Sequence, residues 1–156
     1  MQKIKLLVIM ALLFFNVQAA HSASGDAERL VKNFYHWYIV ESSNRREFLP
    51  GDDTIYEYVD KAVVDHLREL YEKSAFFDAD YFTKSQDIWV EWLDVLTIHQ
   101  AVKMDDALSI VPVSFKLTED RQHHIVIFVG NKNGLLRITK VSGVYPFEDT
   151  PLHMDK

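Results

Sequence analysis

The sequence predicts an α+β protein in which N-terminal helices pack on one face of a curved antiparallel sheet of about four strands. Apolar residues recur at helical spacing in the first half of the chain and alternate at strand spacing in the second half. The last two strand-like segments flank a turn rich in glycine and asparagine. With 156 residues, of which 48% are hydrophobic and 26% charged, the composition is that of a globular chain and not of a disordered or collagen-like one.

Residues 1–19 are predicted to be a secretory signal peptide. Two lysines precede the apolar run LLVIMALLFFNV, and the small residues of QAAHSAS follow it. This run is shorter than the roughly 20 residues that a membrane-spanning helix needs, which argues against a retained anchor. Cleavage is expected after Ala19, with Ser22 as a second choice. Residues 20–156 then form a single α+β domain, exported to the periplasm or secreted beyond it.

The charge and the cysteine content exclude several classes of protein. The chain has 17 Lys and Arg against 23 Asp and Glu, a formal charge of −6, which becomes −8 when residues 1–19 with their two lysines are removed. Such an acidic chain disfavours nucleic acid or anionic lipid as a partner and favours a basic protein. Without cysteine, there is no disulfide, zinc-thiolate site, thiol nucleophile or lipid-modified cysteine.

Two helices open the predicted domain, over residues 26–43 and 55–73. Their apolar positions recur every three or four residues: Leu30, Phe34, Trp37 and Tyr38 in the first, and Val59, Val63, Leu67 and Leu70 in the second. The first helix is expected to be buried on more than one side. The segment between them contains Pro-Gly-Asp-Asp (50–53), a strong turn sequence.

A connection and a sheet follow the helices. The connection FFDADYFTKSQD (76–87) has no sustained periodicity, and a loop of this length inside a compact domain is often functional. From Trp89 onward the chain is predicted to form strands, ahead of a trailing tail from Val144. The strands are expected over residues 95–103, 110–118, 123–129 and 135–141. Pro112 interrupts the second strand and predicts an edge, a bulge or the beginning of that strand.

The last two strands are joined by GNKNG (130–134), which predicts a β-hairpin. Helices on one face of a strongly bent sheet have the cone shape of cystatin-like and NTF2-like folds. This comparison is an analogy of shape.

The sequence shows no motif for catalysis or metal binding. His123 and His124 are adjacent in a predicted strand and so point to opposite faces, and the other histidines lack ligand spacing. Asp78, Asp80 and Asp87 depart from a calcium loop at three positions, and the first two fit better as caps of a short helical turn. No nucleophile elbow, P-loop or dinucleotide fingerprint is present. We therefore expect a protein that is not an enzyme, with no cofactor and no metal, although a Ser–His–Asp triad remains open because its members need not be close in sequence.

Several phrases of the chain resemble a family of small exported bacterial proteins of unknown function with a cystatin-like or NTF2-like fold. These phrases are FYHWYI (34–39), DADYFTKSQD (78–87) and VSF (113–115), followed by the closing hairpin. The resemblance covers residues 26–145. The family includes immunity proteins that block type VI secretion peptidoglycan amidases. Its lipid-anchored members need a cysteine after the signal peptide, and this chain has none, so no membrane anchor is expected.

The resemblance implies a protein, often a homodimer, that binds a cell-wall amidase in the periplasm and occludes its cysteine–histidine cleft. The task needs a protruding polar loop and a charged rim on a rigid scaffold. The candidate partner-binding residues are Asp78, Asp80, Tyr81, Gln86 and Asp87 in the connection, Asp52 and Asp53 in the acidic loop, and Asn131 and Lys132 at the hairpin tip. Alternatively, Gln86 or Asp87 only holds a turn through backbone hydrogen bonds.

A small-molecule pocket is the rival interpretation, because cone-shaped folds often open at one end. Trp37, Tyr81 and Trp92 would then line the cavity, with His124 or Gln86 orienting the ligand. The simpler alternative is that the aromatic residues fill the core. A third interpretation is an enzyme with a histidine and a carboxylate at the open end of the cone.

Overall fold

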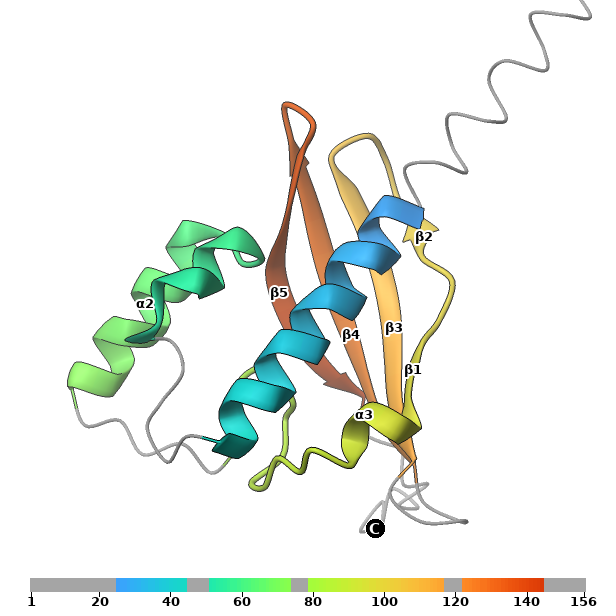
Figure 1. The fold of residues 1–156 in the computed structure, drawn as a ribbon. Helices are drawn as coiled ribbons and strands as arrows, with labels where there is room; N and C mark the ends of the chain where they lie inside the picture. Colours follow the sequence, from blue (N-terminus) through green and yellow to red (C-terminus); the bar gives the residue numbers. More distant parts are fainter. Residues whose placement is uncertain (1–24, 45–50, 74–78, 117–121, 145–156) are drawn as a thin grey trace, which may run out of the picture.

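The computed structural model describes residues 25–44, 51–73, 79–116 and 122–144. A long helix (25–44) comes first, followed by a short 3₁₀ helix and two further α-helices: η2 (Asp53–Glu57), α2 (Lys61–Glu72) and α3 (Trp92–Val95). The strands are β1 (Leu96–Ile98), β2 (Val102–Lys103), β3 (Leu108–Lys116), β4 (Gln122–Lys132) and β5 (Leu135–Val144). The sheet is antiparallel, in the order β1-β3-β4-β5, with β2 also paired to β3. The long helix crosses one face of this sheet (Figure 1), which confirms the predicted α+β class.

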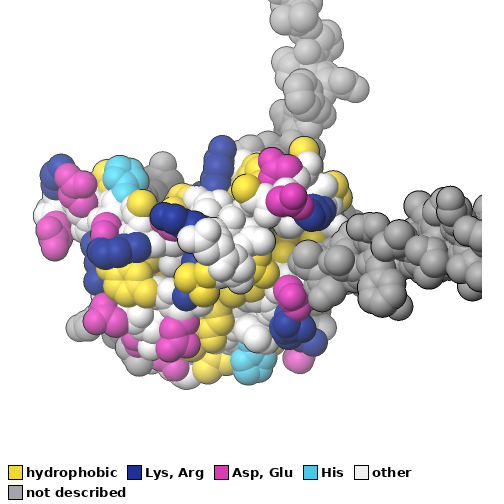
Figure 2. Space-filling view, turned by 90° about the horizontal axis from the view of Figure 1, so that it is seen from above, with side chains coloured by type: hydrophobic (Ala, Val, Ile, Leu, Met, Phe, Trp, Pro, Cys, Tyr) yellow, Lys and Arg dark blue, Asp and Glu magenta, His cyan; other side chains and the backbone are white. Residues whose placement is uncertain are grey.

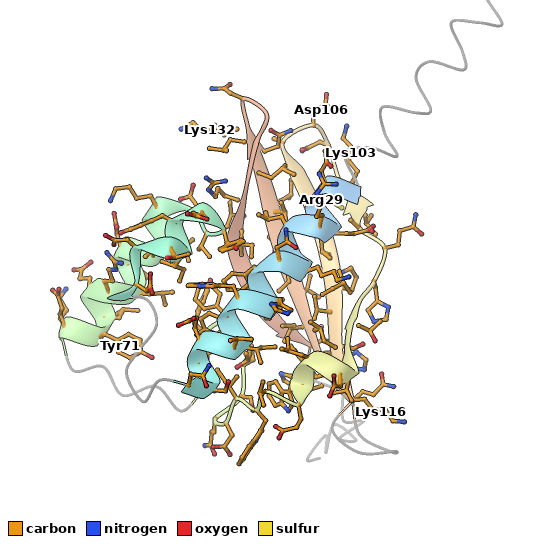
Figure 3. All side chains as sticks on the ribbon, in the orientation of Figure 1. Arg29, Tyr71, Lys103, Asp106, Lys116 and Lys132 are labelled. Carbon is orange, nitrogen blue, oxygen red and sulfur yellow. The ribbon has the colours of Figure 1, made fainter. Side chains whose placement is uncertain are left out.

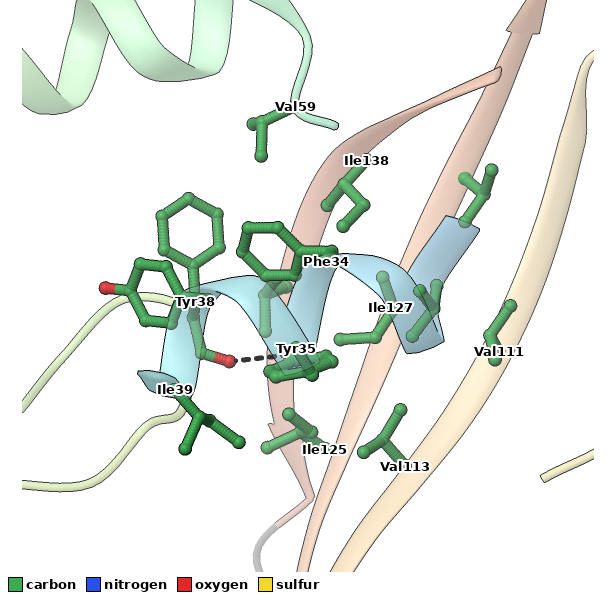
Figure 4. Packing of buried hydrophobic residues seen from close by; sticks show 14 of the residues in the cluster. Phe34, Tyr35, Tyr38, Ile39, Val59, Val111, Val113, Ile125, Ile127 and Ile138 are labelled. Carbon is green, nitrogen blue, oxygen red and sulfur yellow. Dashed lines mark hydrogen bonds between the residues drawn. The ribbon is translucent and has the colours of Figure 1, made fainter. Parts of the chain in front are cut away.

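The helical face of the sheet holds the core. Residues of the three long strands that point toward the long helix are buried. They alternate along β3 and β4, and a shift in the register of β4 and β5 separates the two of β5 by three positions. They are Val111, Val113, Phe115, Ile125, Ile127, Val129, Ile138 and Val141. The helix contributes its own buried set: Ala27, Val31, Phe34, Tyr35, Tyr38 and Ile39 (Figure 4). At 100° per residue these positions fall within one broad face of the helix, about 140° wide. Lys32, Asn33 and His36 on the other side are exposed, so the expected burial on more than one side is not found.

The predicted second helix is in fact two pieces. Residues 58–60 leave the helical path and extend the free edge of β5: Ile138 N donates to Tyr58 O (2.8 Å) and Asp60 N donates to Ile138 O (2.9 Å). Asp60 then caps α2 by accepting a hydrogen bond from Ala62 N (2.9 Å). Backbone pairing with a strand edge thus outweighs the helical periodicity. As a consequence α2 buries Val64 and Leu67, and Val63 is only partly buried.

The first predicted strand was also wrong in its extent. Residues 92–95 form the helical turn α3, because the Trp92 ring packs on Phe115 with centroids 4.9 Å apart. The remainder divides into the short strands β1 and β2. At the break between them, the side chain of Glu28 in the long helix accepts a hydrogen bond from Ala101 N (2.8 Å). The helix therefore supplies the partner that a strand neighbour would otherwise provide.

Pro112 lies inside β3, between two neighbouring strands, and not at the edge, bulge or beginning that the sequence predicted. Its carbonyl accepts a hydrogen bond from His99 N (3.0 Å), so its backbone polar groups face the β1 side of the sheet. There its ring nitrogen lies opposite the break between β1 and β2. The proline is tolerated because the one ladder bond that it cannot donate, to His99 O, would fall just after β1 has ended.

The β4–β5 hairpin is confirmed, with a tighter turn than predicted. Both strands run into the glycine-rich segment, and only Asn133 (φ 55°) and Gly134 (φ 82°) form the turn. Two successive positive φ values are what a two-residue hairpin turn requires. The Asn131 side chain accepts a hydrogen bond from Gly134 N (2.9 Å) and so fixes the tip.

Candidate functional site

The described part of the connection after α2 contains a carboxylate, that of Asp80, which closes the loop on itself. One oxygen of Asp80, Oδ1, accepts hydrogen bonds from Phe82 N (2.9 Å), Thr83 N (2.7 Å) and Thr83 Oγ1 (2.9 Å). The backbone of Asp80 adds two bonds, from Lys84 N to its carbonyl and from its own N to Ser85 O, both 2.8 Å. Asp80 is therefore the cap of a turn, as its sequence context also suggested.

Phenol groups of the long helix fix this loop against the core. Tyr38 donates its hydroxyl to Asp80 Oδ2, and Tyr35 donates to Phe82 O (2.7 Å). Burial, followed by the neighbouring Asp80 carboxylate, raises the pKa of both tyrosines well above 10.0, so both remain donors at physiological pH. The Phe82 ring is fully buried, with its centroid 5.0 Å from those of Phe34 and Tyr38.

Tyr81 and Thr83 tie the same loop to the sheet. The Tyr81 hydroxyl accepts a hydrogen bond from Val141 N (3.4 Å) on β5. His123 Nε2 lies 2.7 Å from Thr83 O, and its ring stacks on Phe115. The Lys84 ammonium lies 4.0 Å from the centroid of the Tyr81 ring, and burial lowers the pKa of that lysine. Residues 80–85 are thus bonded to the helix and to two strands.

Beyond Ser85 the chain turns outward. Gln86 and Asp87 are exposed, and so are the large apolar residues Trp89 (55%) and Val90 (46%). Their carbonyls accept hydrogen bonds from the start of α3, Trp89 O from Trp92 N (3.0 Å) and Val90 O from Leu93 N (3.1 Å). The exposed pair is therefore held by a helical turn whose own Trp92 is buried.

The sequence analysis did not include Trp89 and Val90 among the candidate partner-binding residues, and it placed Trp89 only at the start of the predicted strands. Trp89 and Trp92 are both large and lie three residues apart. The register of the turn decides which of them faces the sheet, and that register depends on the contact between Trp92 and Phe115. No pattern in the single sequence could have distinguished the two.

The other predicted partner-binding residues lie elsewhere on the molecule. Asp52 accepts a hydrogen bond from Thr54 N (2.9 Å) at the start of η2, and Asp53 forms an ion pair with Arg68 (2.9 Å). Asn131 and Lys132 lie at the hairpin end of the sheet, opposite to the end occupied by α3 (Figures 1 and 3). Asp78 falls outside the described residues. The predicted residues therefore form three separate surfaces.

The hairpin end carries charges of both signs. Lys103 and Asp106 form an ion pair there (2.6 Å), and Lys and Arg side chains alternate with Asp and Glu when the molecule is viewed from this end (Figure 2). Large apolar side chains also reach this end: Met104 is 57% and Leu135 56% exposed.

The residues predicted to line a pocket do not face one common space. Trp37 stacks on Tyr58 with centroids 5.4 Å apart, Tyr81 packs edge-on against Phe82, and Trp92 packs on Phe115. These three lie on the helical side of the sheet. His124 projects from the other side, opposite Ser114 in the register of β3 and β4.

The side of the sheet away from the long helix holds a histidine–serine pair that the sequence analysis did not predict. His99 Nε2 lies 2.8 Å from the Oγ of Ser114, a residue only 6% exposed. The register of β1 on β3 creates this pair across 15 residues of sequence.

Within the described ranges, no three His, Cys, Asp or Glu side chains are placed to hold a metal ion. No helix in those ranges has the length and apolar character to cross a membrane.

By its fold, the protein belongs to the class of α+β domains that cover one face of an antiparallel sheet with helices. The chain matches no protein-family model and no curated protein. It is similar in structure to the type VI effector–immunity complex Tae3–Tai3 from Ralstonia pickettii, where the likeness is to the immunity protein Tai3. In the native complex the TM-score is 0.65 at 26% identity, over 77% of this chain and 96% of that one. The selenomethionine form of the complex gives 0.65 at 27% identity, over 77% and 98%.

A further similar structure is a protein of unknown function from Bacteroides thetaiotaomicron VPI-5482. The TM-score is 0.60 at 20% identity, over 83% of this chain and 98% of that one. At this identity the likeness shows the fold alone.

Proposed function

We propose that this protein is a non-catalytic immunity protein that binds a type VI effector, a cell-wall amidase, and blocks its active site. The structural likeness to Tai3 carries the proposal, because it extends over nearly the whole of that chain and comes with 26% identity. The resemblance of residues 34–39 and 78–87 to a family that includes amidase inhibitors supports the same function.

The surface of the molecule is suited to this task. An inhibitor that acts by steric occlusion needs a stiff scaffold and exposed side chains that fill a cleft, and it needs no reactive group of its own. Residues 80–85 are the stiff part, bonded to the long helix and the sheet, and the segment from Gln86 to Glu91 is the exposed part.

The proposed place of action is the periplasm, where an effector that cleaves peptidoglycan meets its substrate. The leader-like residues 1–19 support export. The absence of cysteine means that folding there depends on no disulfide. A homodimer stays a prediction.

The test is capture followed by an enzyme assay. The full chain is expressed with an affinity tag at its C-terminus in its own organism. Proteins that are retained in an amount equal to that of the tagged protein are identified by mass spectrometry. We expect a small amidase whose cleavage of purified peptidoglycan stops when the tagged protein is added back at one equivalent. If the captured protein has no peptidoglycan-cleaving activity, or the tagged protein does not inhibit it, the proposed function is wrong.

A further inference from the structure

The exposed turn at the start of α3 has a composition unlike that of the rest of the surface. Trp89 and Val90 are apolar and exposed, and three exposed carboxylates surround them in sequence, those of Asp87, Glu91 and Asp94. No Lys or Arg occurs between Lys84 and Lys103. We call residues 86–94 the tryptophan turn.

The carboxylates of the tryptophan turn have no side-chain partner among the residues that the structure describes. No ion pair or side-chain hydrogen bond joins Asp87, Glu91 or Asp94 to another residue that the structure describes. Elsewhere exposed acids are mostly paired, for example Asp65 with Lys61 (2.6 Å) and Asp53 with Arg68 (2.9 Å). Among the described residues, Glu57 and Glu72 are also exposed and without an ion pair, but residues 86–94 place three such acids around a solvent-exposed tryptophan, which gives a negative rim that no described cation pairs with.

An exposed tryptophan also has a cost. Its large apolar area remains in water, and nothing in the described part of the chain covers it. The turn could bury Trp89 only by giving up Trp92, since Trp92 fills the site against Phe115. Trp is among the residues that contribute most to binding energy at protein interfaces, and a charged rim determines how fast the partners associate.

Resting on the proposed function, we propose that the tryptophan turn is the segment that enters the effector's cleft, and that this cleft has an apolar floor and a rim of Lys or Arg. The argument for this partner is charge complementarity. The tryptophan turn carries exposed carboxylates and no Lys or Arg, so its electrostatic match is a cleft rimmed by Lys or Arg. The loop of residues 80–85 acts as the base that holds the turn, through the bonds of Asp80, Tyr35 and His123.

The opposite end of the sheet gives a matched comparison. Met104 is as exposed as Trp89 (57% against 55%), but its neighbours include the paired charges Lys103 and Asp106. Among the described residues, this end therefore carries charges of both signs and not a rim of one sign. The proposal predicts that the apolar residue at one end matters for binding and that its counterpart at the other end does not.

The experiment uses the amidase that the wild-type protein captures. Its binding to immobilised variants of the full chain is measured by surface plasmon resonance. Trp89→Ala should weaken binding by about 30-fold or more, Trp89→Phe should recover part of the loss, and Met104→Ala should leave the affinity unchanged. Circular dichroism melting curves check that each variant is folded. Unchanged affinity of a folded Trp89→Ala variant would overturn the proposed location.

Charge reversal tests the chemistry of the cleft. Glu91→Lys combined with Asp87→Lys should slow association about tenfold at low salt, and the difference should shrink at high salt. Glu57→Lys combined with Glu72→Lys, two exposed acids of η2 and α2, is the control with the same change of net charge and should change association little. An unchanged association rate would overturn the cationic rim. If the wild-type protein captures no amidase, the proposed function fails; if it does and the variants still bind normally, only the role of the tryptophan turn fails.

Discussion

The two halves of the segment between α2 and β1 differ in how their polar and apolar groups are used. In residues 80–85 the Asp80 carboxylate has partners on both oxygens, and Phe82 and Thr83 are buried. In residues 86–94 three carboxylates have no partner in the described chain, and Trp89 is exposed. The difference indicates that the first half serves folding and the second half is available for recognition. The phrase DADYFTKSQD (78–87), which carries the family resemblance, extends across the boundary between them.

The largest expected effect in the folded half comes from Phe82→Ala. The ring is fully buried and contacts Phe34, Tyr38 and Tyr81, so its removal leaves a cavity in the core. We expect the free energy of unfolding to fall by about 3–5 kcal/mol, measured by urea denaturation. A loss below about 1 kcal/mol would mean that the loop is not part of the core.

Asp80→Ala is expected to cost about 2–4 kcal/mol of unfolding free energy, because it leaves the backbone N–H of Thr83 and the hydroxyl of Tyr38 without their acceptor. Asp80→Asn is the matched control, since its amide oxygen can still accept from Phe82 N and Thr83 N, and it should cost less. Equal losses for the two variants would show that the carboxylate charge, and not the cap geometry, stabilises the loop.

The buried phenols predict a loss of stability in alkali. Burial and then Asp80 raise the pKa of Tyr35 and Tyr38 in the folded state, and burial raises that of Tyr71 to about 12. In the unfolded chain these groups lose protons above pH 10.0, so the folded state binds more protons and becomes less stable as the pH rises. For Tyr35 and Tyr38 together, the expected loss approaches about 2–3 kcal/mol for each pH unit above 10.0. It should be about half as steep in Tyr38→Phe, as measured by urea unfolding at a series of pH values.

The smallest effect on stability is expected in the exposed half. Trp89→Ala removes a side chain that is 55% exposed, and neither it nor Asp87→Asn removes a side-chain hydrogen bond between described residues, so each should change the unfolding free energy by less than about 1 kcal/mol. Thermal and urea unfolding measure this. Destabilisation of either variant by 1–2 kcal/mol, on the order of a buried contact, would erase the contrast between the two halves.

Patterns of local sequence predicted most of the fold. Helical periodicity predicted the long helix, alternation predicted the long strands, and the residues of the turn predicted the β4–β5 hairpin, because these elements depend on neighbours a few residues apart. Prediction was wrong where a distant partner competed with the local pattern. Residues 58–60 form backbone hydrogen bonds with Ile138 instead of continuing a helix. Trp92 packs on Phe115 from a helical turn instead of a strand.

The candidate site was predicted only in part, for the same reason. The sequence drew attention to the connection and to Gln86 and Asp87 within it, and both are exposed in the structure. It offered a turn-holding role for Asp80 and, as an alternative, for Asp87, and could not show that only Asp80 has it, because the hydroxyl of Tyr38 that also binds Asp80 comes from 42 residues away.

The sequence by itself determined the α+β class and the acidic charge, since both follow from composition and short-range periodicity. Only the tertiary structure decided which tryptophan is buried, which carboxylates are paired and which loop is rigid. Those outcomes depend on contacts between residues far apart in the chain, whose energies compete with local preference and are settled only when the helix docks on the sheet.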